Sequence, residues 1–147
     1  LGAFALSCKP FGEWPVRRLG TGVTIVNAPA NHRELVAWQE AIKLVLLVYR
    51  ETARFPREEL FGLTAQLRKS AVSIPSNIAE GAGRNSTKEL VQFLGYASGS
   101  RAEADSQLEI ASQLGFVRAD SEVFGQLERV GRLITALRKS LRNRVET

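Results

Sequence analysis

Four side chains of the types used in catalysis lie close together in the middle of the chain: Ser73, Ser76, Asn77 and Glu80. Hydroxyl, amide and carboxylate groups can act as nucleophiles, hydrogen-bond donors or general bases. A serine nucleophile also needs an adjacent base, and no histidine follows in this part of the sequence. The residue types alone therefore do not indicate a hydrolytic site here.

The same stretch contains Pro75 and ends at Gly81. A proline inside a helix removes one backbone hydrogen bond, so we predict a kink or break at Pro75. We interpret the polar side chains as partners for the freed backbone groups and for a neighbouring helix, with a ligand or subunit contact as the alternative. A buried Glu80 would need a partner, and Arg68, Arg84 and Arg101 are the candidates. The residues assigned to this structural or interface motif are Ser73, Pro75, Ser76, Asn77, Glu80 and Gly81.

Metal and cofactor chemistry has little material in this chain. The single cysteine, Cys8, and the single histidine, His32, both precede the predicted helices. Di-metal bundles use Glu-x-x-His pairs on facing helices, and the remaining carboxylates are more simply explained as solvated. The glycines at 81 and 83 lack the Gly-Lys-Ser/Thr ending of a phosphate loop, so we predict a turn there. We predict no catalytic residue, no metal site and no cofactor, and we expect that the protein is not an enzyme.

Positive charge is concentrated at the end of the chain. Residues 129–147 contain six Arg/Lys and one Glu, whereas residues 33–128 contain eleven Arg/Lys and thirteen Asp/Glu. Clustered cations favour a polyanion partner; the alternative is a solvated helix face whose cations suit the helix dipole. Few aromatic residues are interleaved, so contacts to phosphate are expected rather than base stacking. The predicted nucleic-acid-binding residues are Arg129, Arg132, Arg138, Lys139 and Arg142.

Four long amphipathic patterns position these residues, at about 33–53, 57–81, 87–114 and 121–143. We predict N-caps at Asn31, Ser86 and Asp120. The third pattern is rich in small residues at 95–100, which allows close approach by another helix. Four long helices with short connections predict an all-α, up-down-up-down four-helix bundle. The apolar seam predicted for the first helix consists of Leu35, Trp38, Ile42, Val45 and Tyr49.

The chain has 147 residues, 44% hydrophobic and 24% charged, with a net charge of +5. These values are ordinary for a globular protein. Glycine and proline punctuate the beginning, so we predict an irregular N-terminal arm at 1–31 and a bundle domain at 32–147. We find no pattern of a signal peptide or a membrane-spanning helix. A single cysteine excludes an intrachain disulfide and fits a reducing compartment, so we expect a cytoplasmic protein with no membrane partner.

The stretch from Phe55-Pro56 to Gly81, with Ser73-Ile74-Pro75-Ser76-Asn77-Ile78-Ala79-Glu80-Gly81 at its end, resembles the signature of the 23S rRNA intervening sequence protein family, also called four helix bundle proteins. The resemblance covers about 34–141. It continues in Leu35-Val36-Ala37-Trp38-Gln39, Gly83-Arg84, Ser86, Glu89, Phe93-Leu94, Gly99-Ser100, Glu103 and Leu114-Gly115-Phe116. The chain departs from the family pattern before Asn31 and at Arg101-Ala102, where an apolar residue is usual.

This resemblance implies a four-helix bundle that assembles into a ring-like homopentamer. Members of the family are encoded in insertions of bacterial 23S rRNA genes and elsewhere in bacterial genomes. A related group comprises accessory proteins of reverse transcriptases in diversity-generating retroelements, where the basic ring binds RNA and the polymerase. The family has no established catalytic residues.

We therefore expect a non-enzymatic, oligomeric bundle with a nucleic-acid-related accessory role. Its expected partners are further copies of itself, RNA or DNA, and a reverse transcriptase or ribosome-related protein, bound through the basic last helix. The alternative is a protein interaction scaffold that does not bind nucleic acid directly.

Overall fold

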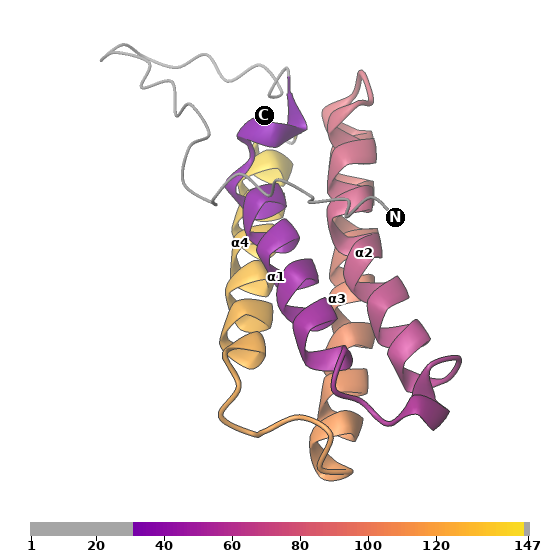
Figure 1. Cartoon of the computed structure of the whole chain (residues 1–147). Coiled ribbons are helices and arrows are strands. Elements are labelled where there is room, and N and C mark those ends of the chain that lie inside the picture. Colours follow the sequence, from indigo (N-terminus) through magenta and orange to yellow (C-terminus); the bar gives the residue numbers. More distant parts are fainter. Residues whose placement is uncertain (1–30, 146–147) are drawn as a thin grey trace, which may run out of the picture.

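The computed structural model describes residues 31–145, and these fold into four α-helices and two short 3-10 helices without a strand (Figure 1). The predicted arm at 1–31, apart from Asn31, lies outside the described residues. The elements in chain order are η1 (His32–Glu34), α1 (Val36–Thr52), η2 (Arg57–Glu59), α2 (Leu63–Ala82), α3 (Thr87–Gln113) and α4 (Glu122–Val145).

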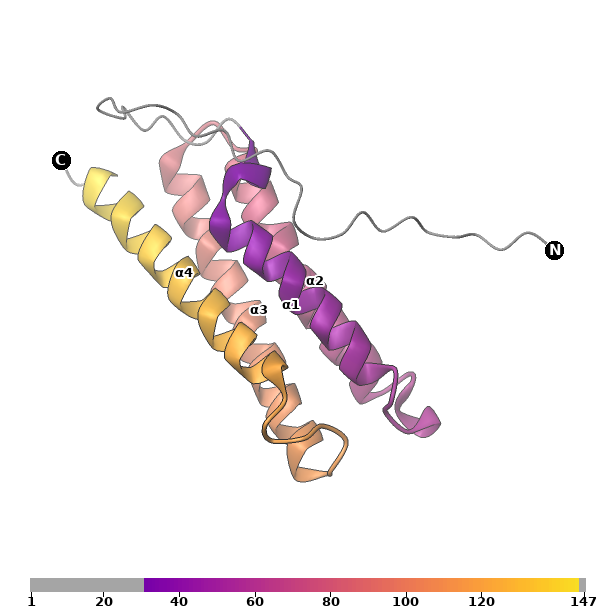
Figure 2. The same cartoon turned by 60° about the vertical axis from the view of Figure 1, so that its left-hand side comes forward.

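Consecutive helices run in opposite directions, and the last helix packs against the first. Each of the pairs α1–α2, α2–α3, α3–α4 and α1–α4 is in contact, so the four helices surround one core. Figures 1 and 2 show this arrangement from two sides. The predicted up-down-up-down four-helix bundle is confirmed.

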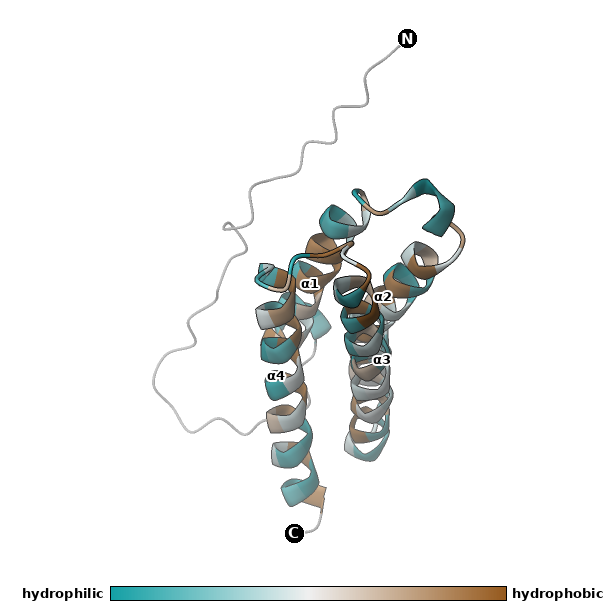
Figure 3. Cartoon of the chain, turned by 90° about the horizontal axis from the view of Figure 1, so that it is seen from below, coloured by the Kyte–Doolittle hydropathy of each residue, from teal (hydrophilic) through white to brown (hydrophobic). Residues whose placement is uncertain are grey.

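The core consists of large aliphatic side chains separated by alanines. Apolar burial of this kind stabilises a fold by roughly 1.5–3 kcal/mol for each large side chain. The small alanines allow neighbouring helices to approach closely. Seen along the bundle, the outer side of α4 is largely hydrophilic (Figure 3). The fully buried residues include Leu44, Val48, Leu67, Ile74, Ile78, Leu94, Leu108, Val130 and Ile134, with Ala41, Ala71, Ala97, Ala104 and Ala111 between them.

The apolar seam predicted for α1 is wrong by one residue. The side chains of α1 that enter the core are Ala37, Ala41, Leu44 and Val48, each one position before a predicted seam residue. One residue turns a helix by about 100°. The predicted seam therefore flanks the side of α1 that faces the core. There Tyr49 is 44% exposed, and its neighbour Leu46 is 54% exposed. The prediction failed because α1 carries two apolar stripes. The bulkier one is only partly buried, with Leu35, Trp38 and Val45 packed against the edge of the core.

Two helices begin later than predicted. Residues 32–34 form η1, and the Asn31 side chain accepts a hydrogen bond from the Arg33 N–H at 3.0 Å. Asn31 therefore caps this short turn and not α1, which begins at Val36. Similarly, η2 and Gly62 occupy the segment where the second helix was expected to start, and α2 begins at Leu63.

The predicted caps of the last two helices have different outcomes. The Ser86 hydroxyl accepts a hydrogen bond from the Glu89 N–H at 3.4 Å, as the capping motif predicts. Asp120 does not cap α4, because its carboxylate pairs with Arg118 at 2.9 Å. The Ser121 hydroxyl instead accepts from the Val123 N–H at 3.4 Å.

Of the kink or break predicted at Pro75, the break does not occur, since α2 continues through this buried proline to Ala82. The Ser76 hydroxyl donates to the Val72 carbonyl at 2.8 Å, and the Asn77 amide donates to the Ser73 carbonyl at 2.9 Å. Proline has no N–H to donate to the carbonyl four residues before it. The Val72 and Ser73 carbonyls are the next two along the helix. The polar side chains therefore add hydrogen bonds to the backbone turn around Pro75.

Candidate nucleic-acid interface

The inward-facing part of the central motif joins α2 to α3. The hydroxyls of Ser73 and Ser100 are 2.9 Å apart, and the Asn77 amide lies 3.0 Å from the Ser73 hydroxyl. One turn of helix earlier, the Ser70 hydroxyl donates to the Gln107 side chain at 2.5 Å. These bonds fix the register of two helices that pack through small residues. They give the serines structural partners on the facing helix.

The outward-facing part of the motif is exposed. Ser76 lies at the surface, and Glu80 forms an ion pair with Arg84 at 2.9 Å, four residues along the same helix. The other two candidate partners of Glu80 are engaged elsewhere. Arg68 lies over the Tyr49 ring at 4.5 Å, and Arg101 pairs with Asp105 at 3.6 Å. Glu80 is thus a surface carboxylate and needs no buried partner.

Gly81 closes the motif at the tightest contact between α2 and α3. A Cβ added to Gly81 would lie 2.6 Å from the Cβ of Phe93 and 3.1 Å from a methyl carbon of Leu90. Atoms this close would overlap. The glycine is therefore required by packing, because any side chain would force the helices apart.

Neither metal-binding clusters nor membrane-spanning helices occur among residues 31–145. No three His, Cys, Asp or Glu residues of this segment are grouped so that they could hold a metal ion. None of its helices is both long and apolar enough to cross a membrane.

The structure divides the five predicted binding cations of α4 into two groups. Arg129 donates to the Glu40 carboxylate at 3.1 Å, and Arg132 donates to the Glu128 carboxylate at 2.6 Å. Arg138, Lys139 and Arg142 form no ion pair with any carboxylate in the described part of the chain. Within residues 31–145, no carboxylate therefore neutralises the second group.

Arg129 belongs to a polar cluster that joins the first and last helices. The buried Glu40 accepts hydrogen bonds from Gln126 at 2.8 Å, Lys43 at 2.7 Å and Arg129 at 3.1 Å. Burial alone would raise the pKa of Glu40, but these donors and the nearby positive charges outweigh it and hold the pKa below its usual value. The ionised carboxylate thus stabilises the packing of α4 on α1.

Stability in acid should report on this cluster. A lowered pKa means that Glu40 contributes its full stabilisation above the unfolded-state value of 4.5, and that this contribution disappears as the pH falls below it. We expect Glu40→Gln to lower the free energy of unfolding by about 1–2 kcal/mol at pH 7, since Lys43 and Arg129 are half exposed. Urea unfolding between pH 7 and pH 3 should show the difference from wild type shrinking toward zero. Glu103→Gln, on the exposed side of α3, is the control; a pH-independent difference for Glu40→Gln would contradict this assignment.

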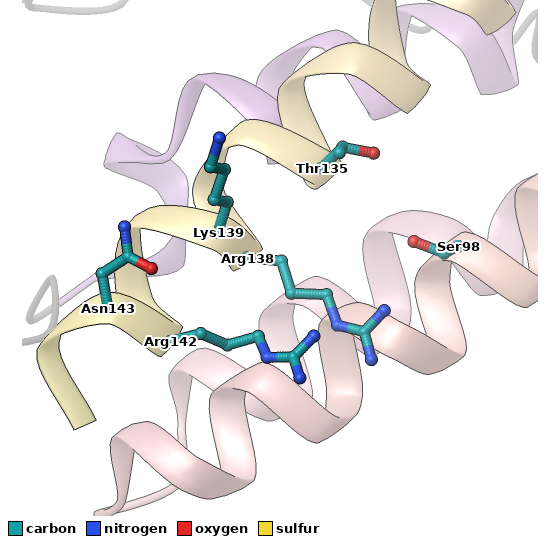
Figure 4. A pocket seen from close by; sticks show the side chains of 6 residues that line it. All are labelled: Ser98, Thr135, Arg138, Lys139, Arg142 and Asn143. Carbon is teal, nitrogen blue, oxygen red and sulfur yellow. The ribbon is translucent and has the colours of Figure 1, made fainter. Parts of the chain in front are cut away.

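The three unpaired cations line one cavity of about 330 Å³ between α3 and α4 (Figure 4). No Asp or Glu is among the described residues that line it. A neighbouring cavity of about 450 Å³ shares Ser98, Thr135 and Lys139 with the first and continues toward Arg132 and Glu128. The two cavities form a groove whose positive charge is concentrated at the C-terminal end of α4. The first cavity is lined by Ser98, Thr135, Arg138, Lys139, Arg142 and Asn143.

Two glycines shape this groove in reciprocal contacts. A Cβ on Gly95 of α3 would lie 3.1 Å from a terminal nitrogen of Arg138, so the α4 guanidinium rests against the α3 backbone. A Cβ on Gly131 of α4 would lie 2.9 Å from the Cδ of Arg101 of α3. Each helix thus provides one arginine and the glycine that accommodates its neighbour's arginine. This packing places the Arg138 guanidinium against α3 at the cavity.

Sequence reasoning missed Gly95, Ser98, Thr135 and Asn143 as parts of the groove. The small residues at 95–100 were a signal, because they indicated close approach of another helix. The structure shows that an arginine side chain lies against Gly95, while nothing lies within 4 Å of a Cβ built on Gly99. No local signal marks the uncharged groove residues on α4, since Thr135 and Asn143 look like ordinary surface residues.

Comparison with known proteins assigns most of the bundle to one family. Residues 33–136 match a family model described as 23S rRNA-intervening sequence protein. A search among curated proteins gives no match to the chain. The match includes Arg129 and Arg132 but ends before Arg138, Lys139 and Arg142. The unpaired cations therefore belong to a part of the chain that the family model does not cover.

Proposed function

This chain belongs to the 23S rRNA-intervening sequence protein family, and on that basis we propose that it is a non-catalytic accessory protein that binds RNA phosphates in the groove between α3 and α4. The observation that carries the proposal is the set of three unpaired cations around one cavity. A cation that is already paired must break its ion pair before it binds a phosphate, so it adds little affinity. An unpaired cation binds the phosphate directly and releases the counterion condensed on the RNA. Arg138, Lys139 and Arg142 are the proposed contacts.

A titration of RNA over a series of salt concentrations tests this function. For single strands, log K falls with log salt by roughly 0.7 for each phosphate neutralised, so three contacts predict a slope of about −2. Gel shift or filter binding with a short single-stranded RNA measures this slope. An acidic protein of similar size is the reference. Affinity no better than that of the reference would exclude direct RNA binding.

We also propose that the protein assembles with copies of itself through the outer face of α1 and α2. Support comes from the second apolar stripe of α1, which includes the exposed Leu46 and Tyr49. Arg68 of α2 lies over the Tyr49 ring, and Val72, 40% exposed, follows one turn later on α2. The family resemblance suggests a homopentamer. Light scattering with and without RNA measures the mass, and a monomer under both conditions would contradict this proposal.

The same apolar face supports the alternative function of a protein interaction scaffold. In that case a reverse transcriptase or ribosome-related protein would bind without RNA, and a pull-down would survive nuclease treatment. Loss of the partner after nuclease treatment would favour the RNA-binding function. Partners of these kinds occur in the bacterial cytoplasm, which is the compartment we propose for both functions.

A further inference from the structure

We propose that the cavity between α3 and α4 binds a phosphate monoester, of the kind found at the end of an RNA strand or in a free nucleotide. That the phosphate belongs to an RNA strand rests on the proposed function. That the cavity binds a phosphate monoester rests only on the residues that line it. The cavity is lined by the cations Arg138, Lys139 and Arg142, by Ser98 and Thr135, whose hydroxyls can donate to a phosphate, and by Asn143.

The charge of the cavity matches a monoester better than an internal phosphodiester. A phosphate monoester carries about −1.5 to −2 charges at pH 7 and three acceptor oxygens. An internal phosphodiester carries one negative charge. Three cations line a single cavity here, and its described lining contains no carboxylate. In the neighbouring cavity Glu128 pairs with Arg132 and Arg101 pairs with Asp105, so Lys139, which lines both cavities, is the one cation of that described lining without a carboxylate partner.

Arg138 is held in position before any ligand binds. Its guanidinium lies against Gly95, and its Nε is buried without a hydrogen-bond partner among the described residues. A buried donor without an acceptor is unfavourable. Figure 4 shows the guanidinium groups of Arg138 and Arg142 both extending toward α3. Two like charges that line one cavity repel each other, and a dianion between them would remove this repulsion.

The size of the cavity fits a small anionic group. A volume of about 330 Å³ lies near the lower end of the range for ligand sites, roughly 300–1,000 Å³. This volume has room for a phosphate with part of its sugar.

The first test compares one RNA oligonucleotide in three forms: with a 5′-phosphate, with a 3′-phosphate and with hydroxyls at both ends. We expect at least one phosphorylated form to bind about tenfold more tightly, which is a modest gain for charge-assisted hydrogen bonds. Arg138→Ala should abolish this preference. Arg118→Ala, at the opposite end of the bundle, removes the same charge and should preserve it. Equal binding of all three forms would show RNA binding without a terminal phosphate site.

The second test uses Gly95→Ala, which leaves the net charge unchanged. The added Cβ would lie 3.1 Å from a terminal nitrogen of Arg138, so the guanidinium must shift by a few tenths of an ångström. Alanine favours the helix, so the variant should fold. We expect the preference for the phosphorylated RNA to fall at least fivefold while the binding of the hydroxyl form changes little. An unchanged preference would overturn the role of Arg138 placement in this site.

The third test separates this site from RNA binding. Adenosine 5′-monophosphate is titrated into the full chain, with adenosine as the control, and backbone amide signals are followed by NMR. We expect shifts at Ser98, Thr135 and Arg138 that are absent in Arg138→Ala. Such shifts in a protein that does not bind RNA would support the phosphate site and overturn the RNA-binding function. RNA binding without these shifts or a terminal preference would overturn the phosphate site alone.

Discussion

Gly81→Val is expected to lower the free energy of unfolding by about 3 kcal/mol, at the upper end of the range for overpacked cores. The new Cβ would meet the Cβ of Phe93 at 2.6 Å and the Cα of Leu90 at 3.4 Å. Both atoms are tied to the backbone of α3, so no side-chain rotation can relieve the contact. The helices α2 and α3 would have to separate, which would also weaken the serine hydrogen bonds between them.

Urea unfolding followed by circular dichroism measures this change, and Gly99→Ala is the matched control. Gly99 lies within a helix like Gly81, but no atom lies within 4 Å of its added Cβ. Alanine at such a site is expected to stabilise the protein by about 0.4–1 kcal/mol. The two glycine variants should therefore move the unfolding midpoint in opposite directions. Similar effects of both variants would show that the Gly81 contact is not a packing constraint.

Replacing Arg138, Lys139 and Arg142 together by alanine is expected to weaken RNA binding about a hundredfold. This figure assumes about 1 kcal/mol for each phosphate contact, below the usual range for hydrogen bonds to charged groups because Lys139 and Arg142 are exposed. The salt slope should fall by about 2. Stability should change little, because these side chains make no ion pair within residues 31–145.

The matched control removes three exposed cations elsewhere: Arg57, Lys69 and Arg118. Both triple variants lower the net charge by the same amount, so a difference between them reports on position and on pairing, since Arg118 is paired with Asp120. We expect the control to lose less than about fivefold in affinity. We further expect Arg132→Ala to lose less than about threefold, because Glu128 already neutralises Arg132. Equal losses in the two triple variants would mean that only the net charge matters.

The helices and their order could be predicted from the sequence because the 3.6-residue pattern and the turn residues are local signals. The buried side of α1 could not, since its two apolar stripes look equivalent without the neighbouring helices. Ala37 and Ala41 are small, so their contribution to a hydrophobic seam is easily underestimated. Whether a stripe is buried depends on α2 and α4, which supply the other surfaces.

The candidate site was predictable in composition but not in geometry. Arg132 could have been recognised as paired, because Glu128 lies four residues earlier on the same helix, and such pairs are local. Arg129 could not, since its partner Glu40 is 89 residues away. The contact between Gly95 and Arg138 likewise joins two helices. Charge counting located the basic helix, and only the fold could divide its cations into paired and unpaired ones.

The polar cluster around Glu40 has a consequence for folding kinetics. Its bond to Arg129 closes a loop of 89 residues, among the longest sequence separations in the described bundle. Closing so long a loop is entropically unfavourable, and contacts of this kind tend to form late. The neighbouring hairpins α1–α2, α2–α3 and α3–α4 need only short loops. We infer that α4 docks on α1 last and detaches from it first. An anion bound between α3 and α4, on the opposite side of α4, would slow that detachment.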